Sequence, residues 1–495
     1  MKIKKILVAN RGEIAIRVMR SAKEMGIATV AVYSEADKDL PHAAYADEAI
    51  NIGPAQASQS YLVQEKIIDA CKKTGADAIH PGYGFLSENA SFAEKVSKEG
   101  ITFIGPSAHA IQVMGDKLTS KQTVKEFGVP LVPGMDEPIN DVATGKRVAD
   151  EIGYPVMIKA SAGGGGKGMR IVHDPKDFED QMERAMSEAK NSFGNEEVFV
   201  EKFITSPKHI EVQIMGDQHG NIVHLFEREC SIQRRHQKVV EEAPSALLTP
   251  SRRSEIGEAA VNVARSCNYY GAGTVEFIAD ENLDFYFLEM NTRLQVEHPV
   301  TELITGVDLV KEQINVAEGE QLSFKQEDLS VNGHSLEVRV YAEDPKNNFL
   351  PDTGKLLKYL RPQGAGVRVD DGYEEGLEVS IHYDPMISKL ITYGKDRTEA
   401  IERMKRAITE YQILGVQTTL PFCQFVLDHP EFRDGTFTTK FVESHFTPDL
   451  LEREIPEELA QVTAIVANEV INDQPLKISS TTDTKKSRWK DRTKL

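Results

Sequence analysis

The sequence predicts an α/β region followed by a larger α+β region, and two patterns support this. Over about the first 115 residues, short apolar runs alternate with helical patterns, which is typical of a parallel, doubly wound sheet. From about residue 205 to 446, strand and helix patterns mix without that alternation, as in an α+β unit. The chain has 495 residues, too many for one hydrophobic core, so we expect two to four packed units.

The first region opens with an apolar run that ends in Asn10-Arg-Gly-Glu. This turn lacks the GxGxxG spacing, so a dinucleotide cofactor is not indicated. The elements predicted here are a strand over 3–9, a helix over 12–25, and strands over 28–33, 76–79 and 102–104.

Composition and charge limit the partners that we expect. The chain carries 77 acidic and 58 basic residues, a formal charge of −19, which argues against broad nucleic-acid binding. No stretch approaches the roughly 18 apolar residues of a membrane helix. Its four cysteines are scattered without a CxxC pair, which is typical of reduced thiols. We therefore predict a cytoplasmic protein with no nucleic-acid and no membrane partner.

Four consecutive glycines, Gly163–Gly166, lie between predicted strands over 154–160 and 169–172. Glycine permits the close backbone approach of a loop around phosphates, although a lone run is more typical of a flexible surface hairpin. Lys167-Gly168 follows, not the Lys-Ser/Thr of a P-loop, and a strand follows, not a helix. The pattern therefore predicts a strand–loop–strand flap, which would lie over a nucleotide if it binds one.

Two further strands are predicted over 274–279 and 285–290, joined by a short turn. A four-residue loop over 281–284 places Glu276 directly opposite Glu289 in an antiparallel pair. Facing carboxylates are destabilising unless a cation lies between them, and magnesium prefers such oxygen ligands. Apolar neighbours indicate a buried hairpin, so we favour metal binding over two solvated acids.

The chain continues from this hairpin as a run of functional side chains. In an extended conformation one face carries Glu289, Asn291, Arg293, Gln295 and Glu297. A straight strand over these eight steps would span about 26 Å, too long for one site, so the segment must bend. We expect its start to bind a metal and its end to bind a second substrate, an anion held by Arg293.

A basic run, Arg234–Lys238, lies in this acidic chain. It forms either a surface ion-pair network or an anion site, and its position alone does not decide between them.

Five long motifs occur in order along the chain. They are Val8-Ala-Asn-Arg-Gly-Glu-Ile-Ala, His80-Pro-Gly-Tyr-Gly-Phe-Leu-Ser-Glu-Asn, Lys159-Ala-Ser-Ala-Gly-Gly-Gly-Gly-Lys-Gly, Glu229-Cys-Ser-Ile-Gln-Arg-Arg-His-Gln-Lys and Glu289-Met-Asn-Thr-Arg-Leu-Gln-Val-Glu-His. They resemble biotin carboxylases, and the resemblance runs from residue 3 to about 446.

This resemblance implies an ATP-grasp fold with four segments. They are an N-terminal Rossmann-like domain over 1–115, an ATP-grasp domain over 116–330 with a mobile lid over about 130–204, a biotin carboxylase C-terminal domain over 331–446, and an extension over 447–495. The extension is predicted as a helix and then a disordered basic tail that contains Trp489. This tail either docks a partner subunit or has no function.

The resemblance also implies roles for residues at matching positions. ATP would be held by Lys117, Lys159, Gly164, Gly165, Gly166, Glu201, Lys202, Ile204, His209, Gln233 and His236. Magnesium or manganese would be bound by Glu276, Glu289 and Asn291, and bicarbonate by Lys238, Arg293, Gln295 and Val296. Biotin would lie near Tyr83 and Arg339. The catalytic residues would be Glu297 as general base together with Arg293, Lys238 and Arg339.

The function implied by the resemblance is ATP-dependent carboxylation of a carrier-bound biotin by bicarbonate, through carboxyphosphate. The sequence contains no Ala-Met-Lys-Met biotin site, so we expect the biotin carboxyl carrier protein and the carboxyltransferase on other chains, and a homodimer by resemblance. An acetyl-CoA or propionyl-CoA carboxylase is favoured, with a two-subunit pyruvate carboxylase as the alternative. Another ATP-grasp ligase or a nucleotide-binding regulatory subunit fits the motifs less well.

Overall fold

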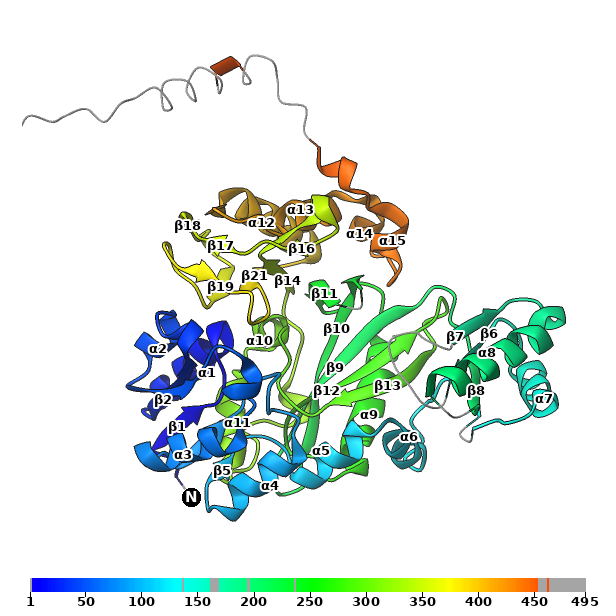
Figure 1. Ribbon diagram of the computed structural model, residues 1–495, viewed down its shortest axis with the longest axis horizontal. Coiled ribbons are helices and arrows are strands. Elements are labelled where there is room, and N and C mark those ends of the chain that lie inside the picture. The colour runs from blue at the N-terminus through cyan, green and yellow to red at the C-terminus, as the bar shows by residue number, and fades with distance from the viewer. Residues whose placement is uncertain are drawn as a thin grey trace, which may run out of the picture. The chain divides into compact units, whose positions relative to one another are not determined.

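In the computed structural model, which describes residues 2–135, 138–160, 169–193, 196–235, 237–452 and 461–462, the N-terminal region forms a five-stranded parallel sheet (Figure 1). Its order is β3-β2-β1-β4-β5, with the bounds Lys5–Val8 (β1), Ala28–Ser34 (β2), Glu48–Gly53 (β3), Ala78–His80 (β4) and Thr102–Phe103 (β5). The prediction of a parallel, doubly wound sheet is confirmed. Strand β3 was missed because it is an edge strand with a largely exposed, weakly apolar sequence.

Helices cover this sheet and extend past it. They are α1 (Gly12–Glu24), α2 (Pro41–Tyr45), α3 (Gln64–Thr74), α4 (Ala90–Lys98), α5 (Ala108–Gly115) and α6 (Lys117–Lys125). The turn from β1 into α1 places Gly12 at φ +62°, a conformation that glycine adopts without strain. Gly372 packs against this turn so closely that a Cβ there would lie 2.7 Å from the Glu13 nitrogen. This contact holds Glu13, in the first turn of α1, against the C-terminal part of the fold.

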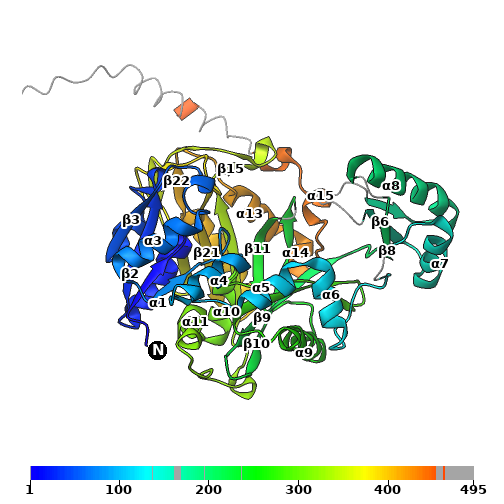
Figure 2. The ribbon, with the colours of Figure 1, turned by 60° about the horizontal axis from the view of Figure 1, so that its bottom comes forward.

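The lid segment forms a three-stranded antiparallel sheet of its own. It contains α7 (Val142–Ile152), β6 (Val156–Ala160), β7 (Met169–Val172), α8 (Phe178–Phe193) and β8 (Val198–Lys202), with the strand order β7-β6-β8. Its apolar residues form a separate hydrophobic cluster, and Figures 1 and 2 show both helices beside this small sheet. The predicted pairing of the strands around the glycine loop is confirmed, while Gly163–Gly166 lie outside the described residues.

The largest sheet has eight strands, and each neighbouring pair among them is antiparallel, as in an α+β region. Its order is β13-β12-β9-β10-β11-β14-β21-β19. The bounds are Lys208–Gly216 (β9), Ile222–Arg234 (β10), Gln237–Ala243 (β11), Gly271–Ala279 (β12), Phe285–Asn291 (β13), His334–Tyr341 (β14), Val367–Asp371 (β19) and Met386–Gly394 (β21). Short two-stranded ribbons lie outside it: β15 (Glu343–Asp344) with β16 (Leu350–Pro351), β17 (Gly354–Lys355) with β20 (Glu378–Val379), and β18 (Lys358–Leu360) with β22 (Gln412–Leu414). Because β11 pairs with β14, one sheet joins the segments on either side of residue 330.

Helices pack on both faces of this sheet. They are α9 (Pro250–Ser266), α10 (His298–Thr305), α11 (Leu309–Ala317), α12 (Arg397–Glu410), α13 (Leu420–Asp428), α14 (Pro430–Asp434) and α15 (Phe441–His445). On β21, Leu390 belongs to the cluster with α12, whereas Ile391 packs with Val300 and Ile304 of α10. Since neighbouring strand residues point to opposite faces, Lys389 lies on the α10 face of the sheet.

The described residues beyond Pro448 belong to a separate unit, Asp449–Leu495. The helix predicted from Pro456 lies largely outside the described residues, and only Gln461 and Val462 are assigned helical. Across the described part of the chain, no helix is long and apolar enough to cross a membrane.

Candidate active site

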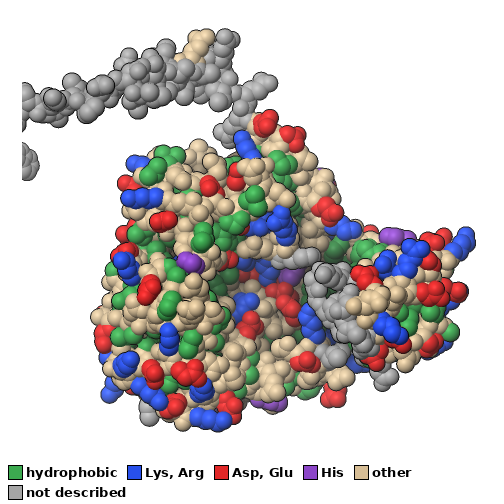
Figure 3. Space-filling model, viewed as in Figure 1, with side chains coloured by type: hydrophobic (Ala, Val, Ile, Leu, Met, Phe, Trp, Pro, Cys, Tyr) green, Lys and Arg blue, Asp and Glu red, His purple; other side chains and the backbone are tan. Residues whose placement is uncertain are grey.

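Acidic and basic side chains gather in a hollow on the face shown in Figure 3. The buried members of this polar group come mainly from the large sheet and from the segment that follows β13. On β9, His209, Glu211 and Gln213 alternate with apolar residues that pack into a hydrophobic cluster. The two-residue period of a strand therefore places these three polar side chains on one face.

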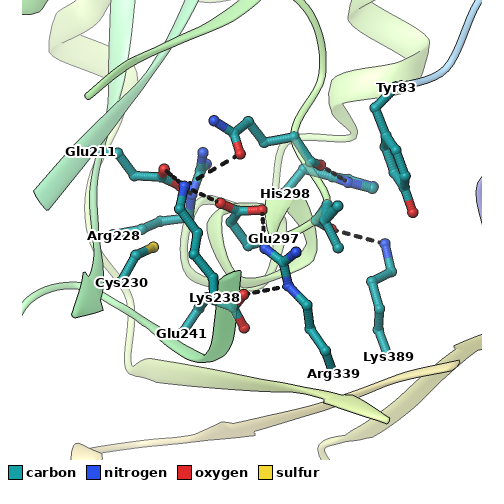
Figure 4. A network of polar contacts seen from close by, with 12 residues as sticks. Tyr83, Glu211, Arg228, Cys230, Lys238, Glu241, Glu297, His298, Arg339 and Lys389 are labelled. Carbon is teal, nitrogen blue, oxygen red and sulfur yellow. Dashed lines mark hydrogen bonds and ion pairs between the residues drawn. The ribbon is translucent and has the colours of Figure 1, made fainter. Parts of the chain in front are cut away.

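Lys238, on β11, lies at the centre of the buried carboxylates (Figure 4). Its Nζ donates to Oε1 of Glu276 at 2.9 Å and to Oε1 of Glu297 at 2.8 Å, and it also contacts Glu211. The Oε1 atom of Gln295 lies 3.5 Å away. Burial opposes the charge of this ammonium, but the three carboxylates outweigh burial and raise the pKa of Lys238 well above its usual range. Lys238 is therefore a fixed cation that faces the 295–297 segment.

Glu297 is fully buried between two cations. Its second oxygen accepts from Arg339, on β14, at 2.9 Å, and Arg339 also donates through Nε to Glu241 at 2.5 Å. Burial favours the neutral acid, but Lys238 and then Arg339 outweigh it and hold the pKa of Glu297 well below its usual range. Glu297 is thus a carboxylate whose negative charge is balanced on both sides.

A second buried ion pair, between Arg228 and Glu211, lies next to Lys238. Arg228, on β10, has no exposed surface and donates through Nε to Glu211. Its two terminal nitrogens donate to Gln213 at 2.7 Å, Thr301 at 3.0 Å and Thr274 at 3.1 Å. The guanidinium thereby fixes Glu211, and Glu211 in turn contacts Lys238.

The predicted acidic hairpin is present, because β12 pairs with β13 and Glu276 lies opposite Glu289 in the ladder. The predicted four-residue loop is wrong: Ala279 pairs with Phe285, and a β-bulge between Glu276 and Phe277 restores the pairing of the two glutamates. The predicted burial holds for Glu276 but not for Glu289, which is exposed. Partial desolvation and then the charge of Glu276 raise the pKa of Glu289. Asn291 donates to Glu276 at 2.9 Å, so two carboxylates and an amide oxygen lie together. This donor set of hard oxygens fits magnesium or manganese. His209 Nε2 also lies 2.9 Å from the second oxygen of Glu276, and with Glu211 these residues could hold a cation in a second way.

The segment after β13 bends, as the length argument predicted. The strand ends at Asn291, and α10 begins at His298. Within this bend, Arg293 donates to Glu88 at 2.7 Å and to Asn291 at 3.0 Å. Glu88 also accepts from the Thr292 backbone nitrogen at 3.1 Å. Glu88, near the end of a motif loop of the N-terminal region, therefore holds the 292–297 segment through both the Thr292 backbone and the Arg293 side chain.

The residues predicted to hold ATP are only partly brought together. Glu201 accepts from Lys159 at 2.5 Å and from Lys121 at 2.8 Å. The charge of Lys117 reaches Glu289 and opposes the rise of that carboxyl pKa.

Other predicted ATP residues show local roles or lie outside the described chain. The Lys202 ammonium donates to the carbonyl oxygens of residues 153 and 154, inside the lid, so it is not directed at the other predicted groups. Gln233 donates to the Cys230 carbonyl oxygen at 2.8 Å, and Ile204 is half-buried. Gly164, Gly165, Gly166 and His236 are outside the described residues.

Tyr83, predicted to lie near biotin, is on the loop after β4. Asn10 donates to the carbonyl oxygens of Pro81 and Tyr83, at 2.8 and 2.7 Å, and so fixes this loop against the end of β1. The Tyr83 hydroxyl donates to Glu13. Figure 4 shows Tyr83 on the same side of the network as Lys389.

Several residues of this network were not found from the sequence. They are Glu13, Glu88, Lys121, Glu211, Arg228, Glu241 and Lys389. The alternation of polar and apolar residues along β9 was the available signal for Glu211. Glu13 and Glu88 lie within motifs that were quoted for the resemblance, whereas Lys389 had no signal other than a charged residue in an apolar strand.

Three family models match consecutive parts of the chain. The model for the biotin carboxylase N-terminal domain matches residues 2–111, and that for the ATP-binding domain of the carbamoyl-phosphate synthase L chain matches 116–325. The biotin carboxylase C-terminal domain model matches 337–444. Together with the relatives below, these matches show that the chain belongs to the biotin carboxylase family, a class of ATP-dependent carboxylating ligases with the ATP-grasp fold.

Relatives and solved structures agree with this class. The chain is 55% identical to a pyruvate carboxylase subunit of Methanothermobacter thermautotrophicus over 441 residues, which is 89% of this chain and 90% of the relative. It is 54% identical to the mitochondrial propionyl-CoA carboxylase alpha chain of Mus musculus over 447 residues, which is 90% of this chain but only 62% of that relative. The biotin carboxylase domain dimer of Hydrogenobacter thermophilus 2-oxoglutarate carboxylase, in complex with MgADP and bicarbonate, matches with a TM-score of 0.82 and 50% identity, covering 92% of this chain and all of that chain.

Proposed function

We propose that this chain uses ATP and bicarbonate to carboxylate a biotin carried by another protein. The observation that carries the proposal is the buried Glu297 carboxylate held between Lys238 and Arg339, beside an acidic hairpin that fits a divalent cation. A general base between two fixed cations is the arrangement that a poorly nucleophilic anion such as bicarbonate requires.

In the proposed mechanism, bicarbonate binds against Arg293, Gln295, the Val296 backbone and Lys238. Glu297 takes the bicarbonate proton, and the charge that develops on the attacking oxygen stays between the same cations. That oxygen forms a bond to the γ-phosphorus of ATP while the bond to ADP breaks, which gives carboxyphosphate. A divalent cation bound by Glu276, Glu289 and Asn291 would neutralise phosphate charge.

The second half of the mechanism takes place at Arg339. Carboxyphosphate is labile in water, so closure of the lid segment would protect it. Its C–O bond breaks to give CO₂ and phosphate, and the phosphate takes the proton from the biotin ureido nitrogen. Arg339 stabilises the enolate form of biotin, and the nitrogen then forms its bond to CO₂. Tyr83 borders the place where biotin would lie.

The test is ATP hydrolysis by the purified chain, with and without bicarbonate and free biotin. We expect turnover that needs bicarbonate and rises with biotin. Glu297→Gln should abolish this turnover while ATP binding survives. Glu255→Gln, the same chemical change on the exposed surface of α9, is the matched control and should leave turnover unchanged. Hydrolysis that responds to neither bicarbonate nor biotin would instead indicate a different ATP-grasp ligase.

The final carboxyl acceptor belongs to a carboxyltransferase that we propose to be a separate chain, as is the biotin carrier. We propose an acyl-CoA, acetyl-CoA or propionyl-CoA, which the similarity to the propionyl-CoA carboxylase alpha chain supports. Pyruvate is the second candidate, because the chain matches the pyruvate carboxylase subunit of Methanothermobacter thermautotrophicus over 90% of that relative's length. Transfer of labelled bicarbonate to each acceptor by the complex purified through this chain distinguishes them.

We also propose that the chain forms a homodimer, as the similar carboxylase domain is named a dimer. Light scattering on the purified chain tests this. A mass of 55.1 kDa, that of one chain, would contradict it.

A further inference from the structure

Lys389 is a fully buried lysine on β21, with none of its surface exposed. It lies opposite Arg339 on β14 and opposite Asp370 on β19. Its Nζ donates to the Val296 carbonyl oxygen at 2.9 Å and lies 3.2 Å from Oε2 of Glu13. A side chain of the C-terminal strands therefore contacts the 292–297 segment and the first turn of α1 at the same time.

The partner Glu13 continues this connection. It is buried in the first turn of α1, and its other oxygen accepts from the Tyr83 hydroxyl. Burial raises the pKa of Glu13 to about 7, although Lys389 acts in the opposite direction. The chain of contacts thus runs from the Val296 carbonyl through Lys389 and Glu13 to Tyr83.

A buried ammonium group in a sheet does not by itself stabilise the fold. Burying a charge is unfavourable unless it is paired and hydrogen-bonded, and an apolar side chain of similar volume commonly gives equal or greater stability. The charge of Lys389 also acts on two other buried carboxyls, Glu337 and Asp370, and lowers the pKa of each. Asp370 accepts its hydrogen bonds from Arg368, and neither oxygen of Glu337 has a hydrogen-bond partner in the described part of the chain. Burial raises the pKa of Glu337 well above its usual range and outweighs the opposing charge of Lys389.

What the ammonium does provide is a fixed donor for one peptide oxygen. The Val296 carbonyl belongs to the peptide that leads into Glu297, immediately before α10. A donor held by three strands of the sheet restricts rotation of that peptide, and the Glu297 carboxylate depends on its orientation.

We propose that Lys389 is a positioning residue that fixes the Val296–Glu297 peptide and, through Glu13, the Tyr83 hydroxyl, so that bicarbonate and biotin meet in the correct geometry. This inference rests on the proposed function for the roles of Val296, Glu297 and Tyr83. In this proposal Lys389 acts through these residues and not by contact with a substrate. It orients the Val296–Glu297 peptide on one side and the Glu13–Tyr83 pair on the other, where the C-terminal strands contact the N-terminal region.

The test separates positioning from stability. Lys389→Met alone leaves Glu13 buried without its cation, so the variant is expected to lose stability. The double variant Lys389→Met/Glu13→Gln removes both charges and should recover most of the melting temperature. Lys395→Met, the same change at an exposed lysine just after β21, is the matched control.

The readouts are melting temperature and steady-state kinetics of bicarbonate-dependent ATP hydrolysis with free biotin. Because small misplacements of reacting groups lower rates by about a hundredfold, we expect kcat/KM for bicarbonate in the double variant to fall at least about tenfold. The KM for ATP should stay within about twofold, since Lys389 contacts none of the proposed ATP residues that the structure describes. A double variant that regains both its stability and the parental kcat/KM would overturn the positioning role alone. If the rate of ATP hydrolysis by the parent protein does not depend on bicarbonate, the proposed function is wrong, and so is the positioning role.

Discussion

Replacing Arg228 by methionine tests whether the buried charges below Lys238 support the fold as a unit. The change removes a guanidinium with no exposed surface that donates to four side chains. Methionine fills a similar volume but cannot donate. The principal loss is the charge partner of Glu211, which is itself fully buried.

The magnitude follows from these contacts. Breaking a buried ion pair by removing one member costs about 3–5 kcal/mol, because the remaining charge is left uncompensated. Lys238 still contacts Glu211 and reduces this loss, whereas the neutral acceptors on Gln213, Thr274 and Thr301 each lose a bond of about 1 kcal/mol. We therefore expect Arg228→Met to lower the free energy of unfolding by about 3–5 kcal/mol.

Denaturant unfolding followed by circular dichroism measures this loss. Arg252→Met is the matched control, since Arg252 forms surface ion pairs on α9 that contribute about 1 kcal/mol or less. The double variant Arg228→Met/Glu211→Gln should be more stable than Arg228→Met, although it contains one more substitution. If Arg228→Met loses no more stability than Arg252→Met, the view of Arg228 and Glu211 as a coupled buried pair is wrong.

Three further predictions concern the site and its surroundings. Glu88→Gln should raise the KM for bicarbonate about tenfold, because Arg293 loses a charged partner at 2.7 Å; an unchanged KM would contradict this. Glu289→Gln should raise the magnesium concentration for half-maximal ATP hydrolysis at least about tenfold; an unchanged magnesium dependence would show that Glu289 is not a ligand. Burial raises the pKa of Glu229 to about 7, so this group stabilises the fold at low pH and that contribution is lost as the pH rises through 7. The stability of Glu229→Gln relative to the parent should therefore increase by about 1 kcal/mol between pH 6 and pH 8, and a constant difference would argue against the raised pKa.

The acidic hairpin illustrates what the sequence could predict. The sequence predicted that Glu276 lies opposite Glu289, and the ladder has this pair, but the predicted register next to the turn is wrong by one residue. Ala279 pairs with Phe285, and a β-bulge between Glu276 and Phe277 restores the pairing of the two glutamates. The bend after Asn291 followed from length alone. Local geometry along a few residues was sufficient for the bend, whereas the bulge that brings the two glutamates opposite each other had no signal in the sequence.

Contacts between distant segments could not be predicted in this way. Lys389 is 93 residues from Val296 along the chain, and Glu88 is 205 residues from Arg293. Neither separation along the chain nor periodicity specifies which strands pair. The sheet places β11 beside β14 and β14 beside β21, although these strands are not consecutive in the sequence. The edge strand β3 was missed for the opposite reason, since its exposed residues give little apolar pattern.

The charge balance around Glu297 resolves an apparent conflict in the proposed chemistry. Lys238 and Arg339 hold the pKa of this carboxyl well below its usual range, which alone would make it a poor base. In the proposed site, bicarbonate bound against Lys238 would experience the same kind of field, which would lower the pKa of its own proton as well. What governs proton transfer is the difference between the two pKa values, and a shared cation changes both in the same direction. The transfer moves one negative charge a short distance between fixed cations, so the buried charges need little rearrangement during the step.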